Sequence, residues 1–329
     1  MADVQRGTMK RIARKDAYEY EMVAKEPLLT VQPGEAFVIE TEDALNGSIQ
    51  RDDQLVITEN LGADRVRALD FNPCAGPIIV EGAKAGDVLA VTIEDIVVAD
   101  QGVTALLQMW GPFKDSAKYA DCRGPHTKII KHLPGPSGTT SDGKGVYNER
   151  ITWDLKPHIG TIGTAPFRAV AAGAHTAVGQ GPHGGNMDVR DICKGSKILL
   201  PVSHDGAHLY VGDVHASMAD GEFAGLADES RSEVTLACEI IPQKQIPWVR
   251  IETPEAIIQL HSFKPLDDAV TQAFFWLVDW LVEEYGFSQR DAAFQMGANP
   301  DVRINIYQMV ILGRINYTVG VSIPKKYLR

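Results

Sequence analysis

The sequence predicts a mainly β protein with sandwich-like and barrel-like parts and a helical insert near the C-terminus, α+β overall. Three observations predict this fold class. Short runs rich in Val, Ile and Thr alternate with turn-forming residues along most of the chain. The 329 residues include 30 glycines and 18 prolines, which indicates many turns and therefore many short elements. Near the C-terminus, apolar residues instead recur at a spacing of three and four.

Each predicted strand is a short run of β-branched and apolar residues bounded by turn signals. In chain order, strands are expected over residues 36–41, 77–81, 87–93, 197–202, 207–211, 233–240, 303–310 and 317–323. Residues 111–145 differ from these runs because they show little periodicity and contain a stretch rich in Pro, Gly, Ser and Thr. We expect an excursion or flap over the surface there.

Helical periodicity is clearest over residues 267–285. The apolar positions of this pattern are Val270, Phe274, Leu277, Val278 and Leu281. Gly286 is the expected C-terminal stop, and Ser288 is expected to cap a second helix over 289–296. Since β-type patterns lie on both sides of this insert at 266–298, we expect residues 1–329 to fold as one interwoven unit.

The composition is that of a soluble globular protein, with 44% hydrophobic and 23% charged residues. The net charge of −11 argues against a nucleic-acid partner, because phosphate binding needs concentrated positive charge. The four cysteines lie far apart and form no C-x-x-C pair, which is typical of a reducing compartment. Residues 1–15 lack the apolar core of a secretory signal, and the apolar run 273–278 is too short to span a bilayer. We therefore expect a cytoplasmic protein with no membrane partner.

Side chains able to do chemistry are densest in residues 179–222, between predicted strands. Asp213 and His215 are two residues apart, so on a strand both side chains point to one face. With His183 and Asp188 from a nearby loop they form a set of N and O ligands that suits zinc or another divalent cation. Glu222 is the candidate base for a metal-activated water. The alternative interpretation is a surface pair or a hydrogen-bonded turn without metal.

Other motifs in the chain give weaker evidence of a functional site. Residues 179–184 match G-x-G-x-x-G, but the Gly-Gly-Asn that follows Pro-His is a poor start for the helix that a dinucleotide site requires. Neither G-x-S-x-G nor H-E-x-x-H occurs. Cys193 lies at a predicted strand-to-turn junction, which favours a buried structural thiol over a nucleophile.

Several motifs, taken together, resemble those of a known protein family. They are P-H-I-G-T-I-G at 157–163, P-H-G-G-N-M-D at 182–188, G-D-V-H-A at 212–216 and D-G-E at 220–222. Further matches are T-E-D-A at 41–44, G-P-I-I-V-E-G-A at 76–83, Y-G-F-S at 285–288, D-A-A at 291–293 and I-P-K at 323–325. In this order, over roughly residues 27–325, they resemble the acetamidase/formamidase family.

The resemblance implies hydrolysis of small carboxamides to a carboxylate and ammonia, with lactams accepted by some members. It also implies a β-rich fold of sandwich and barrel-like parts, a homodimer or higher homo-oligomer, and a divalent metal, zinc or calcium. The site residues that match the family by position are His183, Asn186, Asp188, Asp213, His215, Asp220 and Glu222. Met218 and Ala219 depart from the usual Gln-Gly, which leaves open a bulkier or more apolar amide as the preferred substrate.

These observations lead to the hypothesis of a metal-assisted amidohydrolase acting on a non-peptide C–N bond of a small amide. The metal, zinc first and calcium second, is expected on Asp188, Asp213 and His215, with His183 as a further ligand. Glu222 is expected to take a proton from water and to pass it to the leaving amine.

The remaining site candidates have smaller expected roles. Asn186 is expected to orient the amide, Asp220 is a second catalytic candidate, and Glu81 and Asp43 are weaker candidates for the same pocket. The alternative is a non-catalytic β-sandwich module that binds a ligand and holds a structural calcium. Because calcium sites favour oxygen ligands, His215 in the ligand set would favour the hydrolase over the calcium-binding module.

Overall fold

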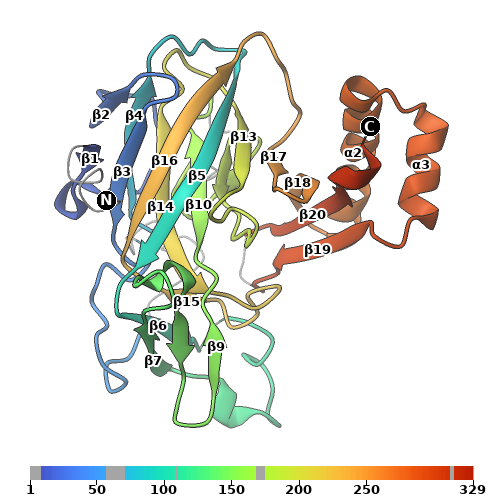
Figure 1. The fold of residues 1–329 in the computed structure, drawn as a ribbon. Coiled ribbons are helices and arrows are strands. Elements are labelled where there is room, and N and C mark those ends of the chain that lie inside the picture. Colours follow the sequence, from blue (N-terminus) through green and yellow to red (C-terminus); the bar gives the residue numbers. More distant parts are fainter. Residues whose placement is uncertain (1–8, 57–70, 109, 168–174, 312–314, 329) are drawn as a thin grey trace.

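The computed structural model describes residues 9–56, 71–108, 110–167, 175–311 and 315–328. Residues 1–8, part of the charged N-terminal stretch, lie outside the described residues. The described chain forms two β-sheets and two α-helices near the C-terminus, with short 3₁₀ turns (Figure 1). The predicted mainly β fold with a C-terminal helical insert is confirmed.

The first sheet has nine strands in the order β1-β3-β16-β5-β13-β17-β18-β20-β19. They are β1 (Lys10–Ile12), β3 (Ala36–Thr41), β5 (Val88–Val98), β13 (Lys197–Pro201), β16 (Ser232–Ile241), β17 (Arg250–Glu252), β18 (Ala256–Phe263), β19 (Arg303–Gln308) and β20 (Tyr317–Pro324). Because β13 pairs with β17, the sheet continues without a break into the C-terminal strands.

The second sheet has eleven strands, of which β14 is the most connected because it pairs with β4, β10 and β15. The strands are β2 (Leu29–Val31), β4 (Cys74–Val80), β6 (Gln101–Leu106), β7 (His126–Leu133), β8 (Lys144–Val146), β9 (Thr152–Asp154), β10 (His158–Thr164), β11 (Gln180–Gly181), β12 (Gly184–Asn186), β14 (Leu209–Ser217) and β15 (Asp228–Glu229). Among the described strands neither sheet closes on itself, so the architecture is a sandwich and not a closed barrel.

The main core lies between the two sheets. Phe37, Leu89 and Leu236 enter it from the first sheet, and Ile162 and Val214 enter it from the second. All five side chains are fully buried. Complete burial of one such aliphatic or aromatic side chain stabilises the fold by about 1.5–3 kcal/mol. This apolar layer anchors β10 and β14, and these strands carry several of the residues described below.

Most predicted strands agree with observed ones, and two differences matter for function. Strand β14 begins two residues later than predicted and runs on to Ser217, so Asp213 and His215 both lie on it. Strand β5 runs on to Val98, because residues 95–98 continue to pair with β16 beyond a register shift at residue 94.

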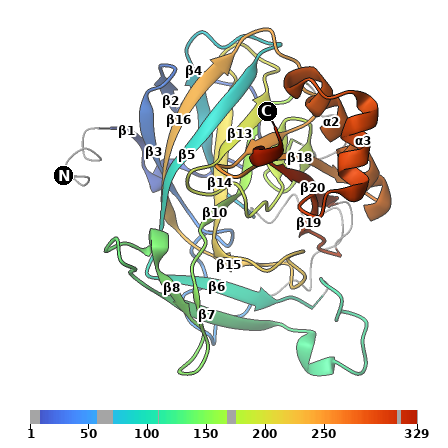
Figure 2. The same ribbon diagram turned by 45° about the vertical axis from the view of Figure 1, so that its right-hand side comes forward.

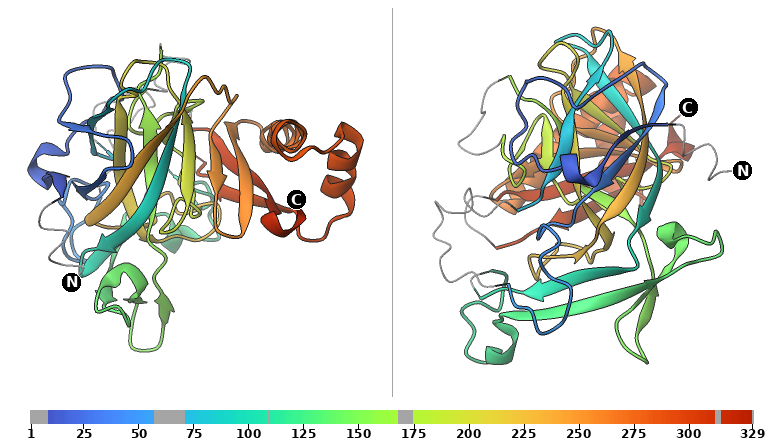
Figure 3. Two further views of the ribbon diagram at one scale, coloured as in Figure 1. Left: turned by 45° about the horizontal axis from the view of Figure 1, so that its top comes forward. Right: turned by 90° about the vertical axis from the view of Figure 1, so that its left-hand side faces the viewer.

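Helix α2 (Leu266–Tyr285) packs on β18 and β20, and α3 (Gln289–Ala298) packs on α2 (Figures 1 and 3). Both predicted caps are confirmed, since Gly286 has a left-handed φ of 69° and the Ser288 side chain accepts the N–H of Asp291 at 3.0 Å. The buried face is centred one residue earlier than predicted, at Ala269 and Ala273. Small alanines allow the helix to approach the sheet closely. Neither described helix is long and apolar enough to cross a membrane.

The predicted excursion at 111–145 contains regular structure. Residues 126–131 of β7 pair with β6, and the short β8 and β9 extend the same sheet (Figure 2). The result is an arm that projects from the sandwich. The period-two signal of β7 is weak in the sequence because its exposed positions include apolar residues such as Leu133.

Candidate active site

The residues singled out for chemistry meet beside strands β12, β14 and β15. Asp213 and His215 project from β14, Asp188 follows β12, and Glu222 lies between β14 and β15. Ligand atoms of Asp188, Asp213 and His215 all lie within 4.8 Å of one another, and so do those of His215, Glu222 and Glu229. The structure therefore brings together three of the four predicted metal ligands and the predicted base.

Backbone pairing explains why Asp188 and Asp213 meet. The Asp188 N–H donates to the Gly160 carbonyl at 3.1 Å, and the register of β10 against β14 places Asp213 across from Gly160. A Cβ added at Gly160 would lie 2.7 Å from Asp188 Oδ1 and 2.8 Å from Asp213 Oδ2. Gly160 therefore leaves the space that the two carboxylates occupy.

Three acids of this cluster have left-handed backbone conformations. The φ angle is +50° at Asp188, +53° at Asp213 and +46° at Glu222. Non-glycine residues seldom adopt this region, and each instance costs on the order of 1–3 kcal/mol. Such strain persists where the surrounding structure enforces it, and it concentrates at functional sites. Its presence at three acids of one cluster supports a functional role for the cluster.

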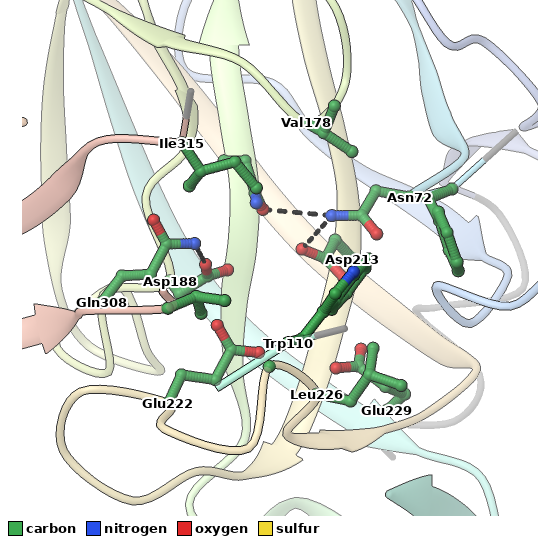
Figure 4. Close-up of a pocket in the computed structure, with 14 residues that line it drawn as sticks. Asn72, Trp110, Val178, Asp188, Asp213, Glu222, Leu226, Glu229, Gln308 and Ile315 are labelled. Atoms are coloured by element: carbon green, nitrogen blue, oxygen red, sulfur yellow. Dashed lines mark hydrogen bonds between the residues drawn. The ribbon is translucent and has the colours of Figure 1, made fainter. Parts of the chain in front are cut away.

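The imidazole of His215 lies among the acids. Its Nε2 is 3.4 Å from Asp213 Oδ1, 3.3 Å from Glu229 Oε2 and 4.0 Å from Asp188 Oδ1. These four side chains are only 1–2% exposed. The carboxylate of Glu222 is directed toward Asp188 (Figure 4).

A second histidine determines which nitrogen of His215 faces the acids. His158 Nδ1 lies 2.9 Å from the Lys156 carbonyl, which can only accept, so this nitrogen carries a proton. Burial lowers the pKa of His158 to about 3, so the ring is neutral and its Nε2 is an acceptor. His215 Nδ1, 3.2 Å away, must then donate to it. The network therefore assigns the proton to Nδ1 and directs Nε2 of His215 toward the carboxylates.

Crowding of buried acids changes their pKa values. Burial raises the pKa of Asp188 well above its usual range, and the charges of Glu222 and Asp213 add to this effect. Burial also raises the pKa of Glu222 to about 7 and that of Glu229 to about 8. Burial alone would lower the pKa of His215, but the charges of Glu229 and Asp213 outweigh it and raise that pKa well above its usual range. Without a cation, the cluster therefore retains protons that a metal would displace.

Amide side chains hold the carboxylates in place. Asn72 donates to Asp213 Oδ2 at 2.8 Å, and the Gln308 amide donates to Asp188 Oδ2 (Figure 4). In the orientation that satisfies its hydrogen bonds, the Asn186 amide nitrogen lies 2.9 Å from Asp213 Oδ2 and 3.2 Å from Asp188 Oδ1. Asn186, expected to orient substrate, thus contacts the two carboxylates.

A small pocket lies against the acids. Its apolar wall consists of Phe71, Trp110, Val178, Leu226, Val310 and Ile315 (Figure 4). Its volume is about 40 Å³. One water-sized group needs about 10–15 Å³, so the space suits a molecule of a few heavy atoms. No Lys or Arg is among the described residues that line it.

His183 does not join the cluster. It lies in the turn between β11 and β12, where its carbonyl accepts the N–H of Thr164 at 3.0 Å. The adjacent Gly184 pairs with Gly163, three residues along β10 from Gly160. At about 3.3 Å per residue, this places the turn about 10 Å from the carboxylates.

Three further candidates also lie elsewhere. Asp220 is 68% exposed and forms an ion pair with Arg190. Glu81 is exposed and accepts from Gln32. Asp43 is buried, but its Oδ1 accepts the N–H groups of Leu45 and Gly47, which is the hydrogen bonding of a turn. None of the three lines the pocket.

Glu229, Asn72 and Gln308 were absent from the sequence prediction. Glu229 belongs to the acid cluster because β15 pairs it with His215. The one feature of the sequence that could have indicated it is its position in an acidic pair after Glu222. Gln308 could have been noticed as a polar residue inside an apolar strand pattern. Nothing in the sequence distinguishes Asn72. Cys193, predicted to be a buried structural thiol, is half-buried, and burial raises its pKa to about 11, which disfavours a thiolate nucleophile.

Comparison with known proteins agrees with this site and fold. A profile described as the Acetamidase/Formamidase family matches residues 24–172 and 154–265. An acetamidase of Mycolicibacterium smegmatis is 32% identical over 242 residues, 59% of this chain and 58% of its own length. A formamidase of Methylophilus methylotrophus is 27% identical over 242 residues, 58% of this chain and 56% of its own length. The chain thus spans less than two thirds of these curated relatives.

Similarity to solved structures is more extensive. The crystal structure of an acetamidase from Yersinia enterocolitica has a TM-score of 0.84 and 31% sequence identity to this chain, covering 98% of this chain and 93% of that one. The acetamidase structure from Bacillus halodurans has a TM-score of 0.81 at 28% identity, covering 96% and 98%. Sequence profile and fold therefore agree, and the chain belongs to the Acetamidase/Formamidase family.

Proposed function

We propose that the protein hydrolyses small, uncharged carboxamides to a carboxylate and ammonia, with a divalent cation held by the acid cluster. The observation that carries the proposal is the buried group of Asp188, Asp213 and His215 against a pocket of about 40 Å³ in a chain of this family. The names of the relatives, acetamidase and formamidase, support the same reaction class.

The donor set fits a divalent cation. Four carboxylates and one imidazole are buried together, and no cationic side chain is among the described pocket residues. Burying charge without a partner costs several kcal/mol per ion, so a cation is the expected complement. Asp188, Asp213 and His215 would hold it, and the imidazole nitrogen favours zinc over calcium, whose sites use oxygen. The same nitrogen argues against the non-catalytic module with a structural calcium.

Such a cation supplies Lewis acidity and lowers the pKa of bound water. Glu222 would act as the base, and the position of its carboxylate within the same cluster supports this role. In the proposed reaction, the water oxygen bonds to the carbonyl carbon while Glu222 takes a water proton. The C–N bond then breaks, and Glu222 returns the proton to the nitrogen, which leaves as ammonia. Asn72, Asn186 and Gln308 keep Asp213 and Asp188 oriented during both steps.

The pocket also indicates the substrate class. The wall that faces the acids is apolar, and the space suits a molecule of a few heavy atoms. An anionic substrate would be repelled by the buried carboxylates. We therefore propose short aliphatic amides as substrates, with a small lactam as the alternative.

Ammonia release from formamide, acetamide, propionamide and benzamide tests the proposal, together with ring opening of 2-pyrrolidinone. Each substrate is assayed with metal-free protein and after addition of zinc or calcium. Short amides should be cleaved, benzamide should not, and chelation should abolish turnover. Full activity in the metal-free protein would exclude the cation but not the amidase reaction. Absence of turnover on every substrate would overturn the reaction itself.

The base is tested by Glu222→Gln, with Asp220→Asn as the matched control two residues away. Removal of a general base costs about 10²–10⁴-fold in rate, so Glu222→Gln should lose at least 100-fold in kcat. Asp220→Asn should retain kcat because its side chain is exposed. Equal kcat in the two variants would remove Glu222 from the mechanism.

A further inference from the structure

A second cavity shares no lining residue with the pocket of the candidate active site and has no role in the proposed reaction. We call it the basic cavity and define it by Lys156, Arg190, Lys194, Ser141, Asn305 and Tyr307. Its volume is about 400 Å³, which is in the range of about 300–1,000 Å³ typical of small-molecule sites. It adjoins the active site through the chain itself, because Arg190 follows Asp188 by two residues and Tyr307 precedes Gln308.

Three cationic side chains line this cavity in a protein whose net charge is −11. Asp191, whose carboxylate also lines the cavity, and the neighbouring Asp95 already have donors. Asp95 Oδ1 accepts from Ser141 at 2.8 Å and from Lys194 at 2.9 Å, and Asp191 accepts from the Tyr307 hydroxyl.

Two cationic side chains of the cavity keep N–H groups without a partner in the described part of the chain. The Lys156 ammonium has no ion pair or hydrogen bond among the described residues, although this side chain is exposed. Arg190 pairs with Asp220 through its Nη2, while its Nε is buried and has no hydrogen-bond partner in the described part of the chain. An unsatisfied buried donor is unfavourable, and the guanidinium gains when a ligand oxygen accepts a hydrogen bond from it.

We propose that the basic cavity binds a small organic anion through its oxygens, with Lys156 and Arg190 as the principal donors. The Asn305 amide adds a neutral polar contact of the kind that orients such a ligand. Carboxylate and phosphate groups share the chemistry that these donors recognise. The proposal does not depend on the amidase reaction, because none of these residues belongs to the acid cluster.

Isothermal titration calorimetry of the full chain tests this site, with succinate and inorganic phosphate as separate probes at constant ionic strength. The variants are Lys156→Met, the charge-preserving Lys156→Arg, and Lys131→Met as a control at another exposed lysine without an ion pair in the described chain. Circular dichroism confirms that each variant is folded.

We expect saturable binding of at least one probe to the wild-type protein at one site per chain. Binding by succinate alone would identify a carboxylate ligand, and binding by phosphate alone would identify a phosphate ligand. Lys156→Met should weaken binding at least tenfold, whereas Lys156→Arg and Lys131→Met should bind as the wild type does. Failure of both probes to bind, or equal affinity in Lys156→Met, would overturn the proposal.

Discussion

Gly160 carries no side chain, yet it shapes the acid cluster. Replacement by alanine would place a Cβ 2.7 Å from Asp188 Oδ1 and 2.8 Å from Asp213 Oδ2. Both carboxylates would have to move, although their backbone is held by strand pairing. We expect Gly160→Ala to weaken zinc binding at least tenfold, measured by competition with a chromophoric chelator.

Gly297 provides the matched control. It lies in α3, and a Cβ there would meet nothing within 4 Å. Alanine in an exposed helix interior is favoured over glycine by about 0.5–1 kcal/mol, so Gly297→Ala should keep zinc affinity and raise the free energy of unfolding. Equal zinc affinity in both variants would show that the cluster tolerates a Cβ at Gly160.

His158 contacts no substrate, and its predicted role is to position His215. It accepts from His215 Nδ1 at 3.2 Å and thereby directs Nε2 toward the acids. Loss of such a partner to a metal ligand commonly lowers metal affinity about 10–100-fold. We expect this loss in His158→Leu and a partial recovery in His158→Gln, whose amide oxygen can accept the same hydrogen bond. Equal zinc affinity in both variants would contradict the positioning role.

Among the elements, α2 gives the clearest stability prediction. Leu277 is fully buried against the C-terminal strands, whereas Phe275 on the same helix is 60% exposed. Truncation of a buried leucine to alanine costs about 2–5 kcal/mol, and an exposed substitution stays within about 0.5 kcal/mol. Leu277→Ala should therefore lower the free energy of unfolding by several times more than Phe275→Ala, as measured by urea denaturation. A similar loss in both variants would mean that α2 does not pack as described.

Strand β14 shows how an element combines two functions. Val211 and Val214 lie in the core between the sheets, while Asp213 and His215 belong to the acid cluster. The period-two rule correctly placed the last two side chains together. The period-two rule could not predict the left-handed φ of Asp213, because that conformation depends on neighbouring strands and not on local sequence preference.

For the whole molecule, metal removal should lower stability. A ligand that binds only the folded state stabilises it by about 2.7 kcal/mol when its concentration is 100 times its dissociation constant. We expect chelation to lower the free energy of unfolding by about this amount and re-addition of zinc to restore it. The Asp213→Asn variant should show a much smaller response to zinc. If neither chelation nor re-addition of zinc changes the free energy of unfolding of the wild-type protein, the result would argue against a cation in the acid cluster.

Local patterns in the sequence determined the mainly β fold, the helical insert with both of its caps, and the grouping of Asp188, Asp213, His215 and Glu222. These features follow from short-range periodicity, from capping chemistry and from motifs that keep their order along the chain.

Tertiary structure alone decided which candidates meet. Strand register keeps His183 away from the acid cluster and brings Glu229 into it. Asp220 and Glu81 are exposed to solvent and do not line the pocket. Asn72 reaches the site from far along the sequence. The physical reason is that a site depends on long-range pairing and packing, in which one position along a strand moves a side chain by about 3.3 Å, and no local pattern specifies that position.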